Sequence, residues 1–381
     1  MEDITKQIKS LASGADETQR KAILVALREV SDSIETPPET IQRLVYLALP
    51  LTAIRIGIDL DIFQTLVKEK TPVSVSDLCA KTGAAPILLA RILRYLASVG
   101  IIKETGKDLF TSNNITEAVA LPGSQGALYN YFYTTYPVWS VLPDFLKDHK
   151  YQDVEENTNT ALQKAHKTEL PFFSWMLTKP TTLAHFNQYM SVHHTGKRSW
   201  LEVYPLEDKI EGLEPEQVFF VDVGGGIGTQ SIALRKKYPD PKLRIVLEDT
   251  PETVAQAVAY PDVQILAQDL FDPQAIIGAR IYYLRNILHD FPDEKCVTIL
   301  KNTVAALAPN SVILIDEMVI PDTGAHFRAT QQDMIVMATF AAVERTQEQW
   351  RNLAEAAGLK VTTTRLYDGN VDDSVIEMVK V

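Results

Sequence analysis

Three alternating glycines form the part of this sequence that is best suited to bind a ligand. Gly224, Gly226 and Gly228 directly follow the short apolar segment 218–223, which is rich in Val and Phe like a buried strand. Because glycine has no Cβ atom, a ligand can lie against the backbone of such a loop. A strand, a glycine turn and a helix in this order form the nucleotide sites of open α/β sheets. The alternative is a tight turn without a ligand.

The spacing of the glycines indicates which nucleotide would bind. A dinucleotide fingerprint needs glycine at the sixth position of G-x-G-x-x-G, but Thr229 or Ser231 stands there, depending on the starting glycine. A phosphate loop needs Gly-Lys-Ser/Thr, and this turn has no lysine. Asp222, just before the glycines, would repel a phosphate but suits a cofactor with an amino group and a sulfonium charge. This combination indicates S-adenosylmethionine.

Two aspartates end the next two predicted strands. Asp249 lies 21 residues after Gly228, where an acid can reach the ribose hydroxyls of a bound nucleotide. An ordinary loop acid or a helix cap is the alternative for this residue. The carboxylate of Asp269 can accept a hydrogen bond from an adenine amino group, while Leu270 and Phe271 cover the ring. For Asp269 the alternative is a cap of the following turn.

His289 follows the fourth predicted strand and therefore lies at the edge of the sheet where the cofactor is expected. A phenol with a pKa near ~10 is a poor nucleophile at neutral pH, whereas a histidine with a pKa near ~6.5 is a competent general base. Removal of the phenol proton creates the oxyanion that attacks the sulfonium methyl in line. A buried structural histidine is the alternative, but its position favours catalysis. The adjacent Asp290 fits a helix cap best and a substrate contact second.

Two glutamates could support His289. Glu317 lies near the end of the fifth predicted strand, and Glu344 directly precedes a helix predicted over about 346–357. A carboxylate beside a histidine holds its tautomer and stabilises the imidazolium. Spacing alone does not show which glutamate reaches the ring, and Glu344 could instead pair with Arg345 or favour the helix N-terminus.

The C-terminal half alternates between strand and helix patterns, which predicts a doubly wound parallel sheet. The expected strands are 218–223, 244–249, 263–268, 280–286 and 311–319, followed by a closing pair at 360–367 and 374–381 with Gly369 and Asn370 near the turn. A helix is expected over 229–237. These elements bring the glycine loop, both aspartates and His289 to one edge of the sheet.

The N-terminal part has a winged-helix pattern. Helices are predicted over 18–33, 44–70 with an interruption near Gly57, 76–83 and 86–99, followed by a hairpin at 101–111. The last of these helices offers only Arg91 and Arg94 to a phosphate backbone. We therefore expect a structural or dimer-forming role rather than DNA binding.

The helical segment 118–205 is rich in aromatic residues, which suits a ring-shaped apolar substrate, although each such residue is by default a core residue. The 381 residues carry a net charge of −12, which argues against nucleic acid or an anionic membrane as partner. Cys79 and Cys296 are far apart, so neither a disulfide framework nor a cysteine zinc site is expected, and a reducing compartment fits. Neither a signal peptide nor a membrane span is expected. These features indicate a cytoplasmic protein.

Together these residues resemble the caffeic-acid type of S-adenosylmethionine-dependent O-methyltransferases from plants and fungi. The similarity covers nearly the whole chain and is carried by the segments 221–228, 248–251, 268–271, 285–294, 315–318 and 344–346. It implies a Rossmann-like class I methyltransferase fold (α/β) with an N-terminal winged-helix dimerisation domain, and a homodimer. The expected domains are 1–120 for dimerisation, 121–210 for a helical linker and substrate-pocket segment, and 211–381 for cofactor binding.

The resemblance also implies roles for individual residues. The implied cofactor contacts are Gly224, Gly225, Gly226, Asp249, Asp269, Leu270 and Arg285, the last at a position where the family often has lysine. His289 resembles the catalytic base, and Glu317 and Glu344 resemble the pair that flanks it. The expected substrate contacts are Phe173, Trp175, Met176, Met190, Asp290, Met334 and Met337. No metal is expected.

Two departures from the plant pattern affect the expected substrate. Residues 340–343 replace a Gly-Gly turn before Glu344, and segment 170–176 is more similar to fungal members, which indicates secondary metabolism. We expect O-methylation of a phenolic or enolic hydroxyl on an aromatic or polyketide-like molecule. The alternative is a member that keeps the cofactor but catalyses a dehydration or pericyclisation. Such members tend to alter the histidine constellation, which is complete here. A transcription factor with a ligand domain is a third, less supported hypothesis.

Overall fold

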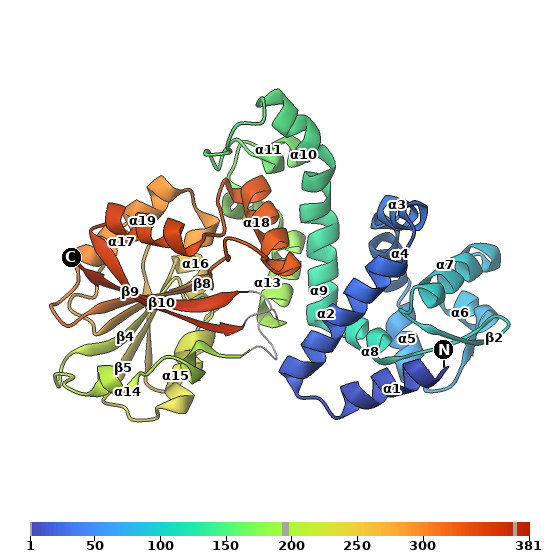
Figure 1. The fold of residues 1–381 in the computed structure, drawn as a ribbon, viewed down its shortest axis with the longest axis horizontal. Helices are drawn as coiled ribbons and strands as arrows, with labels where there is room; N and C mark the ends of the chain where they lie inside the picture. Colours follow the sequence, from blue (N-terminus) through green and yellow to red (C-terminus); the bar gives the residue numbers. More distant parts are fainter. Residues whose placement is uncertain (1, 193–197, 369–371) are drawn as a thin grey trace. The chain divides into compact units, whose positions relative to one another are not determined.

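The computed structural model describes residues 2–192, 198–368 and 372–381. The chain divides into two compact units, Met1–Leu128 and Tyr129–Val381 (Figure 1). Most of the predicted linker segment 121–210 therefore belongs to the second unit, together with the segment 211–381 that was expected to bind the cofactor. The predicted turn at Gly369 and Asn370 lies outside the described residues.

The first unit is mostly helical, with one small antiparallel sheet. The sheet has the order β1-β3-β2 and consists of β1 (Val73–Ser74), β2 (Lys103–Gly106) and β3 (Leu109–Thr111). The helices are α1 (Glu2–Ser13), α2 (Glu17–Ile34), α3 (Pro37–Val45), α4 (Ala48–Asp59), α5 (Ile62–Glu69), α6 (Val75–Thr82), α7 (Pro86–Ser98) and α8 (Asn114–Ala120), and α9 (Pro122–Asn130) contains the boundary between the units. The predicted order of two short helices and a hairpin is thus present in α6, α7, β2 and β3.

The predicted interruption near Gly57 is present, but it lies three to four positions further along the chain, at Leu60 and Asp61. Helix α4 continues through Gly57 to Asp59, and the chain breaks at Asp61, which has a left-handed φ of 52°. A Cβ atom on Gly57 would lie 2.6 Å from the ring of Phe63. This glycine therefore allows α4 and α5 to pack closely, and the helix ends elsewhere.

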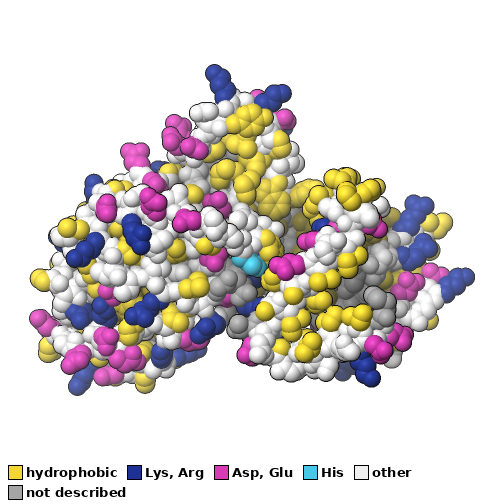
Figure 2. Space-filling view, viewed as in Figure 1, with side chains coloured by type: hydrophobic (Ala, Val, Ile, Leu, Met, Phe, Trp, Pro, Cys, Tyr) yellow, Lys and Arg dark blue, Asp and Glu magenta, His cyan; other side chains and the backbone are white. Residues whose placement is uncertain are grey.

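Helices α2 and α3 expose many apolar side chains. Figure 2 shows hydrophobic side chains gathered over both helices of the first unit. The exposed large residues include Leu24, Val25, Leu27, Val30 and Ile34 on α2 and its end, and Ile41, Leu44 and Val45 on α3. Many exposed apolar side chains on neighbouring helices are typical of a protein–protein interface.

One stretch, Pro37–Asp59, is long and apolar enough to cross a membrane by length and composition alone, although we expected no such stretch. In the structure it is divided into α3 and α4 by a turn at Tyr46 and Leu47. Helix α4 buries Ala53, Ile54 and Ile58 in the core of its own unit. Because core helices pass the same test, this stretch is weak support for a membrane span.

The second unit contains a seven-stranded sheet with the order β6-β5-β4-β7-β8-β10-β9. Its strands are β4 (Val218–Val223), β5 (Arg244–Asp249), β6 (Val263–Ala267), β7 (Ile281–Arg285), β8 (Val312–Met318), β9 (Leu359–Asp368) and β10 (Asp373–Lys380). The first five pair in parallel, and β10 is antiparallel to both neighbours. The predicted α/β fold is confirmed, with strand ends within two residues of the expected ones. The parallel register places the carboxyl ends of β4, β5 and β7 at one edge.

Alternating side chains of β7 and β8 cover both faces of this sheet, as expected for strands buried on two sides. Tyr282 and Ile313 belong to the core under helices α17 (Asp293–Ala305) and α19 (Gln347–Ala356). Tyr283 belongs to the opposite core, which includes helix α15 (Thr229–Lys237) and Trp200, whose ring stacks on Tyr283 at 4.6 Å between centroids. These two layers hold the central strands rigidly.

The remaining helices of the second unit form a separate apolar cluster with the end of α18 (Phe327–Phe340). They are α10 (Tyr136–Asp148), α11 (Ala161–His166), α12 (Phe172–Leu177) and α13 (Pro180–Val192), and the π-helix Tyr131–Thr135 directly precedes α10. Short elements complete the unit: the 3-10 turns Trp200–Glu202 and Leu288–Asp290, α14 (Glu207–Ile210) and α16 (Pro251–Val254).

Candidate active site

The glycine loop after β4 requires glycine for two different reasons. Gly224, Gly226 and Gly228 have φ angles of 70°, 62° and 94°, a region that side chains rarely adopt. A Cβ atom on Gly224 would lie 2.5 Å from Ile287, and one on Gly225 would lie 2.4 Å from Leu247. A Cβ atom on Gly226 would meet no described atom within 4 Å. Gly226 thus faces open space, which is where a ligand can approach the backbone.

Asp222 does not face this open space. Its carboxylate accepts hydrogen bonds from the backbone N (3.1 Å) and the Oγ (2.7 Å) of Ser231, in the first turns of α15. Burial raises the pKa of Asp222 to about 6, against the opposing effect of these bonds. The expectation that Asp222 favours a positively charged cofactor is therefore not supported, since its carboxylate instead joins the strand to the helix.

Asp249 connects the end of β5 to the glycine loop. Its Oδ2 accepts a hydrogen bond from the backbone N of Gly226 at 2.8 Å, and its Oδ1 accepts one from Thr250 at 2.7 Å. The predicted proximity of this acid and the loop is present. The ribose contact stays a prediction.

Asp269 and Leu270 lie in the turn that follows β6. Oδ1 of the exposed Asp269 accepts a hydrogen bond from the backbone N of Phe271 at 2.8 Å, which is the turn-capping alternative. Leu270 is near the loop, because a Cβ atom on Gly224 would lie 3.7 Å from its side chain. The adenine contacts of both residues stay predictions.

Arg285 belongs to a buried polar network at the end of β7. Its Nε lies 3.6 Å from Oδ2 of Asp316. The same Oδ2 accepts a hydrogen bond from the hydroxyl of Tyr283, and Oδ1 of Asp316 accepts one from the hydroxyl of Tyr367 at 2.6 Å. Burial lowers the pKa of Arg285, but the charges of Asp316 and of the neighbouring Tyr283, Tyr367 and Asp373 together raise it by more. The network joins β7, β8 and β9, and the predicted adenosine contact of Arg285 is untested.

His289 lies in the turn Leu288–Asp290, directly beyond β7. Its Nδ1 is 2.8 Å from Oε1 of Glu344, and its Nε2 is 3.7 Å from Oδ1 of Asp290. A carboxylate accepts hydrogen bonds, so Nδ1 carries the hydrogen in this contact. Oε1 of Glu317 instead accepts the backbone N–H groups of Ile287 (3.0 Å) and Leu288 (2.7 Å). Glu344 thus orients the ring and Glu317 orients the turn that carries it.

The charges of this group favour a protonated imidazole. Burial lowers the pKa of His289, but the charges of Glu344, Asp290 and Glu317 raise it by more, to about 10. Burial also raises the pKa of Glu317 to about 7 and that of Asp290 to about 6. The pKa of the imidazolium is thus close to that of a phenol near ~10, so a proton can move between the two groups at little cost.

The capping interpretation of Asp290 is wrong. Helix α17 begins at Asp293, with Pro292 before it and without a side-chain cap. Asp290 ends the 3-10 turn and places its carboxylate beside the second ring nitrogen of His289. Asp290 therefore belongs to the candidate active site.

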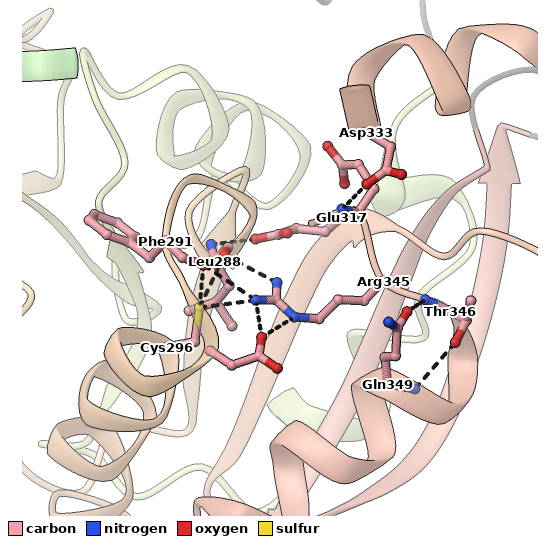
Figure 3. A network of polar contacts seen from close by, with 10 residues as sticks. Leu288, Phe291, Cys296, Glu317, Asp333, Arg345, Thr346 and Gln349 are labelled. Carbon is pink, nitrogen blue, oxygen red and sulfur yellow. Dashed lines mark hydrogen bonds and ion pairs between the residues drawn. The ribbon is translucent and has the colours of Figure 1, made fainter. Parts of the chain in front are cut away.

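Two residues of the site were not foreseen from the sequence. Oδ1 of Asp333 on α18 accepts the backbone N–H of Glu344 at 2.9 Å. The guanidinium of Arg345 reaches from the next residue to Leu288, Phe291 and Cys296 (Figure 3). No sequence signal links these partners, which are 11 and more than 40 positions apart.

The predicted substrate contacts divide into two groups. Trp175 and Met176 are buried, with Met176 only 1% exposed, and they fill the cluster under α18, as the core alternative proposed. Phe173, Met190 and Met334 are 42%, 39% and 48% exposed, and Met337 is partly buried against the same cluster. Helix α18 lies against the turn Leu288–Asp290, so Met334 and Met337 belong to an element that borders the site.

His289, Glu317 and Glu344 also form a group of possible metal ligands, with one ligand atom of each within 4.8 Å of the others. The 2.8 Å contact between Nδ1 of His289 and Oε1 of Glu344 is a hydrogen bond, however. A metal at usual ligand distances needs an unprotonated nitrogen and more room between these two atoms.

The chain combines a helical N-terminal unit with a doubly wound sheet, and one edge of this sheet carries a glycine loop and a histidine–carboxylate pair. This combination defines the class of two-domain methyltransferases. Residues 139–360 match the O-methyltransferase domain, and residues 26–118 match the O-methyltransferase dimerisation domain. The chain belongs to the O-methyltransferase family and is an enzyme of that family.

The relatives are similar over nearly their whole lengths. Demethylsterigmatocystin 6-O-methyltransferase from Aspergillus parasiticus is 38% identical over 97% of this chain and 95% of that protein. A solved structure of LepI in complex with SAM, 35% identical, covers 100% of this chain and 98% of that chain with a TM-score of 0.95. A structure described as a pericyclic reaction enzyme, also 35% identical, has the same coverage and a TM-score of 0.94.

Proposed function

We propose that this enzyme transfers a methyl group from S-adenosylmethionine to a phenolic or enolic hydroxyl of an aromatic or polyketide-like secondary metabolite. The observation that carries the proposal is the His289–Glu344 pair at the carboxyl end of β7, one strand away from the glycine loop. The order and spacing of these groups suit a base that acts beside a nucleotide-like methyl donor. The names of the fungal relatives, which are O-methyltransferases, support the reaction class.

The residues around the glycine loop fit the cofactor. The open space at Gly226 admits a ligand to the backbone, and Asp249 and Leu270 border the same loop. When bound there, S-adenosylmethionine supplies an electrophilic methyl group. The SAM complex of a relative with 35% identity supports this assignment.

The protein's own groups would manage the proton of the substrate. His289 accepts the hydroxyl proton at Nε2, because Nδ1 is occupied by Glu344. Glu344 stabilises the resulting imidazolium, and Asp290 adds a second negative charge near Nε2. Glu317 keeps the turn in place through the N–H groups of Ile287 and Leu288.

Exposed apolar side chains of α12, α13 and α18 support an apolar, ring-shaped substrate. Phe173, Met190 and Met334 expose apolar surface, and Phe173 lies 5.6 Å from Phe340 between ring centroids. Aromatic and methionine side chains of this kind suit flat molecules of variable shape.

A screen of phenolic and enolic fungal metabolites with S-adenosylmethionine, read by mass spectrometry, tests the reaction. We expect a product heavier by one methyl group. His289→Ala should bind the cofactor normally but lose turnover by roughly two orders of magnitude or more. His149→Gln, a change of the histidine that caps the C-terminus of α10 outside the site, serves as the control. Unchanged turnover in His289→Ala would remove this residue from the mechanism.

A non-methyl reaction such as a dehydration or pericyclisation is the second candidate. It is favoured by the likeness to a structure described as a pericyclic reaction enzyme. An imidazolium with a pKa near 10 could also serve as an acid in such a reaction. The same screen distinguishes the two candidates, because a dehydration product loses one water and a pericyclic product keeps the substrate mass. Neither a dehydration nor a pericyclic reaction would consume S-adenosylmethionine.

We also propose that the enzyme is a homodimer formed through its first unit. The match of residues 26–118 to a dimerisation domain supports this assembly. The apolar side chains exposed on α2 and α3 offer a surface that a second copy can cover.

A further inference from the structure

We propose that Arg345 is a positioning residue for His289: its guanidinium holds the two ends of the turn Leu288–Phe291 so that the imidazole meets Glu344. This proposal rests on the role of His289 in the proposed function.

The guanidinium of Arg345 bonds to the backbone on both sides of His289. Nη1 donates to the carbonyl of Leu288 at 3.1 Å, and Nη2 donates to the carbonyl of Phe291 at 3.4 Å. Figure 3 shows the side chain extended toward these two residues and Cys296. The residues that Arg345 holds thus enclose His289 and Asp290 in the sequence, so a shift of this turn would move both side chains.

Other contacts fix the guanidinium itself. Nε and Nη2 donate to Oδ1 of Asp293 at 3.0 and 2.6 Å, and the guanidinium carbon lies 5.1 Å from the centre of the Trp350 ring. Arg345 is 1% exposed. With its charge paired and its donors used, the side chain has one geometry, which it imposes on the turn.

Arg345 and Glu317 divide the polar groups of the turn between them. Glu317 on β8 accepts the N–H groups of Ile287 and Leu288, whereas Arg345 donates to the carbonyls of Leu288 and Phe291. Glu344, the direct neighbour of Arg345, contacts the ring. One dipeptide therefore binds both the histidine side chain and the backbone that carries it. Lysine cannot replace this arrangement, because it lacks the planar fork of donors.

The pKa of His289, measured by NMR in the purified full-length enzyme, separates positioning from other roles. The groups that face the imidazole are Glu344, Asp290 and Glu317. If Arg345→Met releases the turn, the ring loses its close contact with Glu344, and the pKa of His289 should fall by at least about one unit. If Arg345 acted only as a nearby positive charge, its removal would raise the pKa. A buried structural arginine would leave the pKa unchanged. A rise or no change would overturn the proposal.

Variants make this test specific. His289→Gln assigns the signal. Arg345→Lys, which keeps the charge without the fork, should show a smaller fall in the pKa. Arg235→Met is a matched control, because Arg235 is also buried and donates to backbone carbonyls, those of Asp240, Leu243 and Asp262, away from the site. It should reduce stability without changing the pKa of His289. If Arg345→Met does not fold, Asp293→Asn removes the exposed anchor of the guanidinium and should lower the same pKa.

Turnover gives a second readout once a substrate is known. Arg345→Met should reduce kcat about tenfold to a hundredfold, with little change in KM or in cofactor affinity. If His289→Ala keeps full turnover, the proposed role of His289 as base fails, whereas the NMR result still decides whether Arg345 positions the ring. The two failures are therefore distinguishable.

Discussion

Oε1 of Glu344 lies 2.8 Å from Nδ1 of His289, although the two residues are 55 positions apart. This charge is the largest single influence that raises the pKa of His289 against the effect of burial. Glu344→Gln keeps the size of the side chain and removes the charge. The variant's behaviour therefore reports directly on the proposed base.

We expect Glu344→Gln to lower the pKa of His289, because a negative charge that favours the imidazolium is removed. A base must be unprotonated, so the rising limb of kcat/KM against pH should move to lower pH by about one unit or more. The limiting rate at high pH should fall roughly tenfold, since the imidazolium formed during the reaction is less stabilised. Glu348→Gln, at an exposed position of α19, is the control. An unmoved limb would show that Glu344 does not act on the base.

The glycine loop predicts a contrast between neighbouring substitutions. In Gly225→Ala the new Cβ atom would lie 2.4 Å from Leu247 and 2.5 Å from Asp222, so we expect a loss of about 2 kcal/mol in the free energy of unfolding. In Gly226→Ala the space is open but φ is 62°, so the loss should be near 1 kcal/mol. Urea unfolding measures both losses. In calorimetry with S-adenosylmethionine, Gly226→Ala should lose more cofactor affinity than Gly225→Ala relative to the stability that each variant loses. If Gly226→Ala bound the cofactor as tightly as the wild type, the cofactor would have to bind elsewhere.

The buried carboxyl of Glu248 on β5 predicts a pH dependence of stability. Burial raises its pKa to about 7, from an ordinary value of 4.5, against the hydrogen bond from Gln274. A group with a raised folded-state pKa contributes its full stability below pH 4.5 and loses it as the pH rises through 7. Glu248→Gln removes this loss, so relative to wild type it should gain about 2 kcal/mol between pH 4.5 and pH 8. The exposed Glu252→Gln should show no such gain in urea unfolding at the two pH values. Parallel curves for wild type and Glu248→Gln would contradict the raised pKa.

The proposed dimer gives a prediction about mass. Light scattering of the wild-type enzyme should give twice the chain mass of 42.5 kDa. The double variant Val30→Glu with Val45→Glu places charges on the apolar surface of α2 and α3 and should shift the mass toward that of one chain. Leu366→Glu changes an exposed apolar residue of the second unit and should leave the mass unchanged. A wild-type mass near 42.5 kDa would refute the dimer.

The sheet and the glycine loop were predictable because their signals are local. Continuous apolar runs identify buried parallel strands, and glycines at Gly224, Gly226 and Gly228 reflect φ angles that other residues rarely adopt. Strand order in a doubly wound sheet then brings the strand ends together. His289 could be placed at this edge for the same reason.

The side-chain partners could not be read from the sequence in the same way. Asp222, Asp290 and Gly57 each fit a local rule, but tertiary contacts decided their roles: Ser231 for Asp222, His289 for Asp290 and Phe63 for Gly57. The pairs of Glu344 with His289 and of Arg345 with Leu288 join segments that are more than 50 positions apart. Such pairs depend on how α18 and β8 return the chain to the end of β7, which local patterns do not specify.

The two hydrogen bonds that Asp249 accepts, from Gly226 and from Thr250, have a consequence for affinity. The bond from Thr250 fixes the carboxylate, and the bond from Gly226 fixes the glycine loop to it before any ligand arrives. The conformational entropy of this loop is therefore lost during folding and not during binding. A ligand that fits the loop meets a preorganised surface, and its association should be limited by diffusion and solvent release rather than by loop ordering.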